Sequence, residues 1–558
     1  MSFRDDIKAG AEADHAENIK SDDPPEGTTK GVHNVSTYLT HQSGLAIIAE
    51  SQALLYEAVQ ESQLGRWSPS AIRIYFAIFV AFCCAVANGY DSSLLAGMLP
   101  MEYFQNAFHT GTSGPKVSLI ACLYTVGHIV GSPIGAVISD KYGRRWTMFC
   151  GCWIVILGMV IVVASKSLAA FSVGRFVLGL GITLSTLAAP AYAMEISPPH
   201  WRGRATGLYN CGWFGGSIPA AAVTFGCNYI KNDYSWRIPL ILQACGAIIV
   251  ICSVFFIPES PRFLMANGKE QEALDFLVKY HGGGDPNSKL VALEYAEFKE
   301  GISQTGSDKR WWDYRCLVKT RNARWRSAQV IMMGVAGQYS GNGLAYFNTV
   351  IYQKLGIKAV TEQLGYNLLY AFISALGALC GAILSDRMPR RKVLVFGTLA
   401  CAGWLAINAG LQSAMATHAE PVPPALSKGA LAAYLLFNFN FMFCYTPLQA
   451  VIPAEALETT IRAKGFALLN ITTGAMGFLN QFCGPIALGN IGYQYVYVFV
   501  AWDVVEAGFW FLFGVEGQGR TLEELEWVYD QPNPVKASLS TQRVVVGPEG
   551  GVRAVDDI

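Results

Sequence analysis

Charged residues are scarce in this chain of 558 residues, of which they make up 15%, against roughly 25% in ordinary soluble proteins. Neither sign prevails, since 41 Lys and Arg residues balance 41 Asp and Glu residues. A net charge of zero gives no electrostatic basis for binding a polyanion. We therefore expect no nucleic-acid partner.

The sequence also lacks the residue sets on which catalysis and metal binding depend. It has no nucleophile–base set, phosphate-binding loop or metal cluster, and its 14 cysteines show no metal-ligand spacing. Cys83 and Cys84 lie within an apolar stretch, where cysteine behaves as a small hydrophobic residue. These absences argue against an enzyme, and we expect no cofactor.

Apolar residues, by contrast, make up 52% of the chain and are gathered into long runs. A helix needs about 20 apolar residues to cross a bilayer core of ~30 Å. Lipid cannot hydrogen-bond an open backbone, so each such run is expected to be helical. The runs of this length are twelve, at 72–96, 117–139, 146–165, 169–193, 205–226, 236–257, 327–349, 364–385, 393–411, 429–452, 464–486 and 492–514. The sequence predicts an all-α protein that spans the lipid bilayer twelve times.

The basic residues between these runs favour one side of the membrane. They occur in alternate short loops, as Lys141, Arg144 and Arg145, Arg202 and Arg204, Arg387, Arg390, Arg391 and Lys392, and Arg462 and Lys464. By the positive-inside rule that side is the cytosol. With an even number of spans, both termini are predicted to be cytosolic.

An internal repeat relates the two parts of the chain. The stretch Gly135-Ala-Val-Ile-Ser-Asp-Lys-Tyr-Gly-Arg-Arg145 is nearly the same as Gly381-Ala-Ile-Leu-Ser-Asp-Arg-Met-Pro-Arg-Arg391. Each lies between two apolar runs. Such duplication is typical of transporters that hold a substrate between two halves, and six helices in each half make the repeats parallel.

The composition then divides the chain into five parts. We expect a cytosolic N-terminal tail (1–66), a six-helix bundle (67–257), a cytosolic linker with amphipathic helices (258–326), a second six-helix bundle (327–514) and a cytosolic C-terminal tail (515–558).

Two ionisable residues lie inside predicted spans at similar depth. Asp91 is near the outer end of the first span, and Arg175 is a few residues into the fourth. Buried ionisable groups in membranes usually mark ion or substrate paths. A carboxylate that is ionised beside arginine and neutral when alone is a proton switch. The alternative is a static buried ion pair. His128 in the second span could titrate, but its position favours a hydrogen-bonded structural histidine. Asp503 and Glu506 lie within the last span, and the sequence assigns them no role.

Charges at the predicted cytosolic helix ends repeat their order in both halves. They are Arg144, Arg145, Glu195, Arg202, Glu259 and Arg262 in the first half, and Arg390, Arg391, Glu455, Arg462 and Glu516 in the second. They could serve topology alone, by staying in water. Their repeated spacing favours a cytosolic gate, since exposed ion pairs are worth about 0–1 kcal/mol and can open readily.

The seventh span begins with Gly337-Gln-Tyr-Ser-Gly-Asn-Gly343 and continues to Tyr346, Phe347 and Asn348. Dense glycines weaken a helix, and amides beside aromatic rings suit the hydroxyls and C–H faces of a sugar. No charged residues cluster here, which disfavours a charged substrate. A glycine-packed helix interface would explain the glycines but not Gln338, Asn342 and Asn348 together.

Taken together, these stretches resemble the sugar porter family of the major facilitator superfamily over about residues 70–530. The matching motifs are Gly89-Tyr-Asp91, Asp140-Lys-Tyr-Gly-Arg-Arg145, Gly174-Arg175, Pro190-x-Tyr-x-x-Glu195-Ile-x-Pro-x-x-x-Arg202-Gly203, Pro258-Glu-Ser-Pro-Arg262 and Gly519-Arg-Thr-Leu-Glu-Glu524. The seventh span looks like that of the fungal lactose and cellodextrin permease branch.

The resemblance implies transport by alternating access, with Asp91 and Arg175 at the family's proton-coupling positions. Passive facilitators of the family tend to lack this aspartate, so its presence favours proton symport, with the proton as co-substrate. The resemblance implies sugar contacts from Asn210, Gln338 and Asn342, an outer gate of Tyr346 and Phe347, and further contacts from Asn480 and Gln481. Asn348 joins these predicted contacts because of its amide in the seventh span. A tryptophan that the family often carries in the tenth span is Ala450 here, which suggests a roomier site.

We therefore expect a proton-coupled importer of a neutral hexose or disaccharide, monomeric and in a fungal plasma membrane. One alternative is a transporter or exporter of another neutral metabolite. Another is a nutrient sensor that transports nothing, although the tail after residue 530 is short for signalling.

Overall fold

The computed structural model describes residues 67–199, 202–307, 315–384, 387–417, 423–457, 462–518, 525, 528–539, 542–546 and 552–556. Contacts divide the chain into two compact units, Glu57–Thr541 and Met1–Tyr56 with Gln542–Ile558. Each unit is described by itself below.

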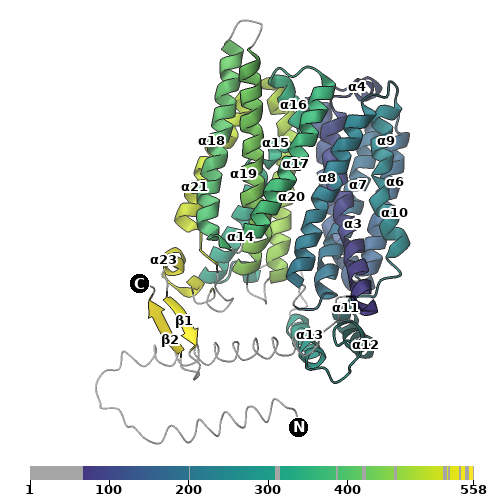
Figure 1. Cartoon of the computed structure of the whole chain (residues 1–558), viewed down its shortest axis with the longest axis vertical. Coiled ribbons are helices and arrows are strands. Elements are labelled where there is room, and N and C mark those ends of the chain that lie inside the picture. The colour runs from purple at the N-terminus through teal and green to yellow at the C-terminus, as the bar shows by residue number, and fades with distance from the viewer. Residues whose placement is uncertain are drawn as a thin grey trace, which may run out of the picture. The chain divides into compact units, whose positions relative to one another are not determined.

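The larger unit is helical throughout its described regular structure and forms two bundles side by side (Figure 1). The helices of the first bundle are α3 (Pro69–Met98), α4 (Glu102–Phe108), α5 (Pro115–Tyr142), α6 (Arg144–Ala164), α7 (Leu168–Glu195), α8 (Arg202–Cys227), α9 (Tyr234–Leu242) and α10 (Ala244–Ser253). Those of the second are α14 (Arg321–Tyr339), α15 (Asn342–Ala345), α16 (Asn348–Lys354), α17 (Val360–Leu384), α18 (Arg390–Thr417), α19 (Pro424–Ala456), α20 (Arg462–Asn490) and α21 (Gln494–Phe513).

Each of the twelve apolar runs coincides with a helix or with two or three consecutive helices. Among the described residues, nine candidate spans are long and apolar enough to cross a membrane. The helices α8, α14 and α20 are not among these nine, and α8 and α20 supply much of the cavity lining described below. The predicted helical membrane fold of two parallel halves is confirmed.

Small residues bring the helices of the first bundle into close contact. A Cβ atom on Gly179 of α7 would lie 2.1 Å from the backbone oxygen of Tyr124 on α5. Only glycine permits this approach of two backbones. The helix starts follow local capping rules, since the Ser68 hydroxyl accepts a hydrogen bond from Ala71 N (3.2 Å) just before α3.

The linker between the bundles folds into α11 (Pro261–Ala266), α12 (Glu270–Tyr280), α13 (Lys289–Ser307) and a short 3-10 helix, η1 (Arg315–Leu317). Helices α11 to α13 lie at one end of the first bundle (Figure 1), which we call the inner end. A buried contact holds them there. His281 Nδ1 lies 2.5 Å from Glu294 Oε2, and its Nε2 lies 3.1 Å from the backbone oxygen of Ile196, which follows α7.

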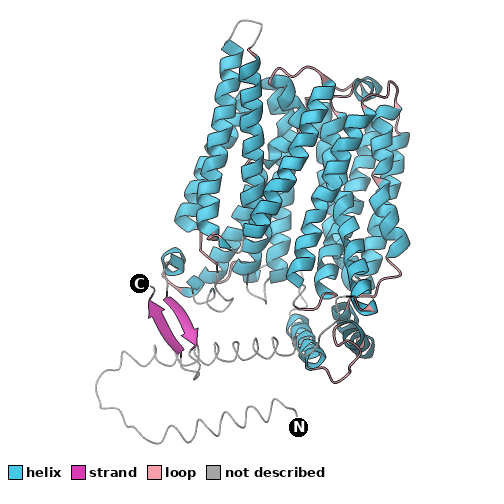
Figure 2. Ribbon diagram, viewed as in Figure 1, coloured by secondary structure: helices cyan, strands magenta, loops and turns pink. Residues whose placement is uncertain are grey.

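The C-terminal tail has more regular structure than the sequence predicts. It contains α23 (Pro534–Leu539), and the smaller unit contains the strands β1 (Gln542–Val546) and β2 (Val552–Asp556). The two strands are antiparallel, with Val544 opposite Ala554 (Figure 2). Valines favour strands because their branched side chains fit a pleated surface. The hairpin belongs to the smaller unit, whereas the described regular structure of the larger unit is all-α as predicted.

The contact made by His281 predicts how the linker responds to mutation. His281→Ala removes one hydrogen-bond partner from a buried carboxylate and one from a buried carbonyl, and a lost hydrogen bond to a charged group costs about 1.5–3 kcal/mol. We expect the apparent Tm of the purified protein in detergent to fall by several degrees and proteolysis within the linker to accelerate. Lys279→Ala, at an exposed position on α12, is the control. Equal behaviour of the two variants would contradict the assigned contact.

Candidate functional site

A buried ion pair joins α3 and α7 in the first bundle. Arg175 Nη1 donates to Asp91 Oδ1 over 2.9 Å, and the two residues are 3% and 0% exposed. Gln243, between α9 and α10, donates to the same oxygen from its Nε2 over 2.7 Å. The structure therefore places the two predicted proton-coupling residues in direct contact. Their role in proton coupling stays a prediction.

An aromatic ring and a histidine flank this pair. The Arg175 guanidinium lies over the ring of Tyr124, 4.4 Å from its centre, and that ring is 4.8 Å from the ring of His128. Within the described part of the chain, Asp91 Oδ2, the Tyr124 hydroxyl and His128 Nε2 are buried and have no hydrogen-bond partner. Asp91 thus has one oxygen held by two donors and one oxygen at which a proton could add.

The two bundles enclose two adjoining cavities. One, of about 550 Å³, is lined by Arg175, Tyr124 and His128 from the first bundle and by Gln338, Tyr346 and Gln481 from the second. The other, of about 610 Å³, shares Tyr346 and Trp213 with the first and extends to α17 and α19. Arg175 of the ion pair and the predicted sugar-binding residues Gln338, Asn342, Tyr346 and Asn348 of the seventh span therefore border adjoining cavities.

The seventh span is broken where its glycines are densest. Helix α14 ends at Tyr339, and Gly341 has φ +108°, a left-handed conformation that favours glycine. A Cβ atom there would also lie 2.0 Å from the Phe437 ring. Asn480 of α20 donates to the backbone oxygen of Gln338 over 2.8 Å and so satisfies a carbonyl at the end of α14.

The predicted sugar-binding residues divide into three groups. Asn210, Asn342 and Tyr346 line the larger cavity, while Gln338 and Gln481 line the smaller one. Asn348 also lines the larger cavity, but its amide is engaged by the Tyr434 hydroxyl and by Asn367. Asn480 and Phe347 border neither of these two cavities, and Asn480 instead supports the break in α14. The side chain of Ala450 lies outside the described part of the structure.

Sequence reasoning did not select several other residues that line these cavities. Trp213, Asn367, Gln449 and Asn470 all border the larger one. Asn470 carried a signal, because it repeats the spacing from Glu455 that Asn210 has from Glu195. Trp213 lies three positions after Asn210 on α8, so it faces the same side of that helix. Nothing in the sequence pattern singles out Asn367 or Gln449.

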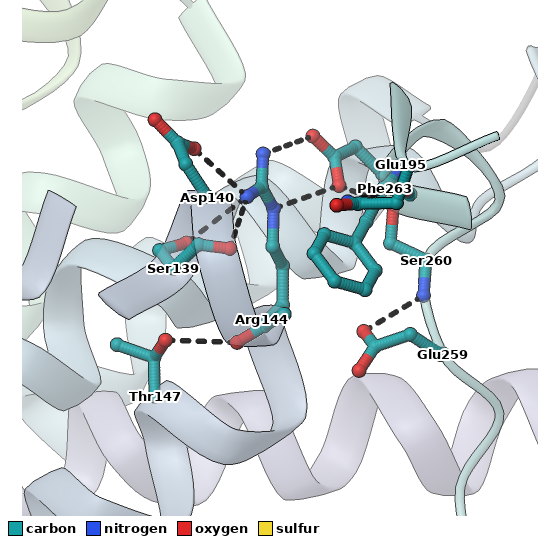
Figure 3. Close-up of polar contacts among 10 residues, drawn as sticks. Ser139, Asp140, Arg144, Thr147, Glu195, Glu259, Ser260 and Phe263 are labelled. Atoms are coloured by element: carbon teal, nitrogen blue, oxygen red, sulfur yellow. Dashed lines mark hydrogen bonds and ion pairs between the residues drawn. The ribbon is translucent and has the colours of Figure 1, made fainter. Parts of the chain in front are cut away.

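At the inner end, charges link helices within the first bundle (Figure 3). Arg144 Nε and Nη2 donate to the two oxygens of Glu195 over 3.2 and 3.3 Å, and Arg144 Nη1 also lies 3.1 Å from Asp140 Oδ1. The Ser260 hydroxyl donates to Glu195 Oε2 over 2.5 Å. Glu195 at the end of α7 is thereby joined to the start of α6 and the start of α11.

The second bundle repeats this arrangement. Arg390 Nη2 lies 3.2 Å from Glu455 Oε1, as Arg144 contacts Glu195. Arg391 donates to the backbone oxygens of Trp510 and Phe511, as Arg145 does to those of Val254 and Phe255. The sequence repeat is therefore also a repeat of contacts.

The remaining predicted gate residues are placed as follows. Glu516 accepts hydrogen bonds from the backbone N–H groups of Arg390 and Arg391. Burial raises the pKa of the Glu259 carboxyl, while the Ser260 N–H and Arg145 act in the opposite direction. Arg262 is exposed on α11. Arg202 and Arg462 begin α8 and α20, and their side chains lie outside the described part of the structure. A gating role for this set stays a prediction.

At the opposite, outer end, contacts cross between the bundles. The Thr349 hydroxyl on α16 donates to the backbone oxygen of Ala96 on α3 over 3.0 Å, and Asn228 Nδ2 donates to the Thr361 hydroxyl over 3.1 Å. Phe347, fully buried, belongs to the hydrophobic core of the first bundle although it comes from the second. The described outer ends are thus packed together.

Two repeated helical halves around a cavity are typical of membrane transporters. The family model described as "Sugar (and other) transporter" matches residues 76–529. The chain belongs to this family.

Fungal transporters are among its relatives. The chain is 26% identical over 522 residues to a high-affinity glucose transporter of Kluyveromyces lactis, covering 89% of this chain and 93% of the relative. It is also 26% identical over 461 residues to the MFS-type transporter criB of Aspergillus cristatus, covering 82% and 93%.

Among solved structures, the proton:xylose symporter XylE bound to 6-bromo-6-deoxy-D-glucose matches with a TM-score of 0.66 and 19% identity, covering 83% of this chain and 100% of that one. The inward-open xylose transporter XylE from E. coli matches with a TM-score of 0.63 and 20% identity, covering 82% and 100%. At these identities the likeness is one of fold.

The helix break at Gly341 gives a prediction. Gly341→Ala puts a side chain in a left-handed conformation and against Phe437, so the variant should lose several degrees of apparent Tm and transport more weakly. Gly403→Ala on α18, where a Cβ would meet open space, is the control and should behave like the wild type. The measurement is thermal unfolding in detergent with uptake into vesicles. A Gly341→Ala variant as stable as the control would contradict the described break.

Proposed function

We propose that this protein carries a neutral sugar, a hexose or a disaccharide, across the membrane together with a proton. The observation that carries the proposal is the position of the Asp91–Arg175 pair. Its arginine borders the same cavity as Gln338, Tyr346 and Gln481. A proton site and a polar, uncharged binding site on connected space are what symport needs.

The lining of the larger cavity supports a neutral substrate. Its described lining residues include asparagines, serines, a glutamine and aromatic rings, but none with a charge. Amide groups can both donate and accept hydrogen bonds, as sugar hydroxyls require. Trp213, Tyr346 and Phe441 supply rings on which the C–H face of a sugar can lie. The glucose transporters among the relatives agree with this assignment.

The proton is proposed to bind at Asp91 Oδ2. Protonation there neutralises the carboxyl, weakens its attraction to Arg175 and frees the guanidinium to shift toward the smaller cavity that it borders. A sugar bound between the bundles then favours closure of the bundles around the site that holds both sugar and proton. A buried carboxylate without a partner is unfavourable. Protonation of Asp91 is therefore coupled to whether Asp91 contacts Arg175.

Alternating access requires the two ends to open in turn. The contacts of Thr349, Asn228 and Phe347 would close the outer end, and the ion pairs of Arg144 and Arg390 would stiffen the inner end of each bundle. We place the inner end in the cytosol, because the basic loops lie on that side, and we propose the plasma membrane as the location.

A second candidate, transport of another neutral metabolite, is favoured by the resemblance to criB, whose name specifies no sugar. A panel of labelled monosaccharides, disaccharides and other neutral metabolites, offered to proteoliposomes of the purified protein, separates the two. Uptake of at least one sugar is expected. Flux of other solutes without any sugar would overturn the sugar assignment, and no flux at all would favour a sensor.

Asp91→Asn tests the proton site. The amide cannot release a proton, so the variant should exchange labelled sugar across the membrane but should not take up protons with it. Asp233→Asn, at an exposed acid, is the control and should couple normally. Both are measured in proteoliposomes with a pH-sensitive dye and labelled sugar. Sugar-driven proton uptake by Asp91→Asn would contradict the assignment.

A further inference from the structure

A second buried acid lies in the other bundle, far along the chain from the Asp91–Arg175 pair. Glu506 of α21 is 0% exposed, and four donors meet its carboxylate. Oε1 accepts from the Tyr445 hydroxyl and from Trp510 Nε1 (3.1 Å). Oε2 accepts from the Ser340 hydroxyl and from Trp502 Nε1 (3.1 Å).

These four donors carry no charge. An ionised carboxylate has about four lone-pair sites and can only accept, so two donors on each oxygen satisfy it. Tyr445 in turn lies 2.5 Å from the Thr398 hydroxyl on α18. The carboxylate is therefore the centre of a network that joins the end of α14 to α18, α19 and α21.

The connection to α14 is made at the break in the seventh span. Ser340 directly precedes Gly341, whose left-handed conformation ends the helix. Gln338 lies two residues before Ser340, and Asn342 two residues after it. Both border the cavities. A bond that fixes Ser340 thus fixes the backbone between two proposed sugar contacts.

The hydrogen bond from Tyr445 to Glu506 likewise affects residues of α19 that line the cavity. Phe441 and Gln449 lie one helical turn on either side of Tyr445 and border the larger cavity. The Phe441 and Tyr445 rings stack with centres 5.1 Å apart. Fixing Tyr445 therefore orients the α19 wall of the cavity as well.

We propose that Glu506 is a positioning residue for sugar binding, which holds the broken seventh span and α19 in register through Ser340 and Tyr445. This rests on the proposed function as a sugar transporter. Glu506 does not touch the cavity itself among the described lining residues. Glu506 therefore affects sugar binding only through Ser340 and Tyr445.

Asp503 supplies a matched control. It lies about one turn from Glu506 on the same helix and is also 0% exposed, but neither of its carboxylate oxygens has a hydrogen-bond partner among the described residues. Asp503→Asn therefore removes a buried acid from α21 without breaking a bond to the helix break.

The test compares Glu506→Gln, Ser340→Ala, the double variant and Asp503→Asn. In Glu506→Gln the amide nitrogen must face one of the two indole N–H groups, which cannot accept a hydrogen bond. We expect its KM for sugar to rise about tenfold or more, with a smaller change in kcat, because the residues that bind the sugar are no longer held in place. Ser340→Ala should raise KM in the same direction, and the double variant should be no worse than the more affected single variant.

The readouts separate positioning from mere stability and from proton transfer. Uptake is measured in proteoliposomes over a range of pH, with apparent Tm in detergent as a check on folding. The pH profile of the variants should match that of the wild type, and Asp503→Asn should keep the wild-type KM. If Glu506→Gln does not fold, Ser340→Ala alone decides.

Three outcomes overturn the proposal. They are an unchanged KM in Ser340→Ala, an equal KM rise in Asp503→Asn, and a shifted pH profile in Glu506→Gln, which would indicate a second proton site made by the two acids. A wild-type protein that transports other solutes but no sugar would instead refute the proposed function, so the two failures are distinguishable.

Discussion

The structure depends on the cost of burying a charge where no water can solvate it. A lone ionised carboxylate is very unfavourable in such a place, and partners at hydrogen-bond distance make it tolerable. Asp91 meets this condition through Arg175 and Gln243, and Glu506 meets it through four neutral donors. The first arrangement can be released by one proton. The second has no charged partner to lose, which suits a fixed support.

The broken seventh span borders the cavities and contacts Glu506 through Ser340. A continuous helix would satisfy its own backbone and present only side chains. The left-handed Gly341 exposes the end of α14, and Asn480 and Ser340 tie that end to α20 and α21. Broken helices at the binding site are common in transporters built from repeats. Here the break places Gln338 of one bundle on the same cavity as Arg175 of the other, which would connect the proposed sugar site with the proposed proton site.

Much of this could be predicted from the sequence, because lipid imposes simple rules on length and polarity. The spans, the repeat and the contact between Asp91 and Arg175 follow from apolar runs and from two buried charges. Contacts between side chains that are far apart in the sequence could not be predicted in this way. The burial of Phe347 in the core of the opposite bundle, the support that Asn480 gives to Gln338, and the ring of donors around Glu506 depend on how helices rotate against one another. Local periodicity does not encode that rotation, nor did it reveal the β1–β2 hairpin.

The central claim is that the energy of a proton gradient reaches the sugar through one carboxyl group. The most direct measurement is the final ratio of sugar inside to sugar outside sealed proteoliposomes, as a function of an imposed pH difference. The account predicts that the ratio rises above one when the side of sugar entry is acidic, increases with the size of the pH difference, and returns to one when a protonophore is added. A ratio that stays at one for every imposed gradient would contradict it.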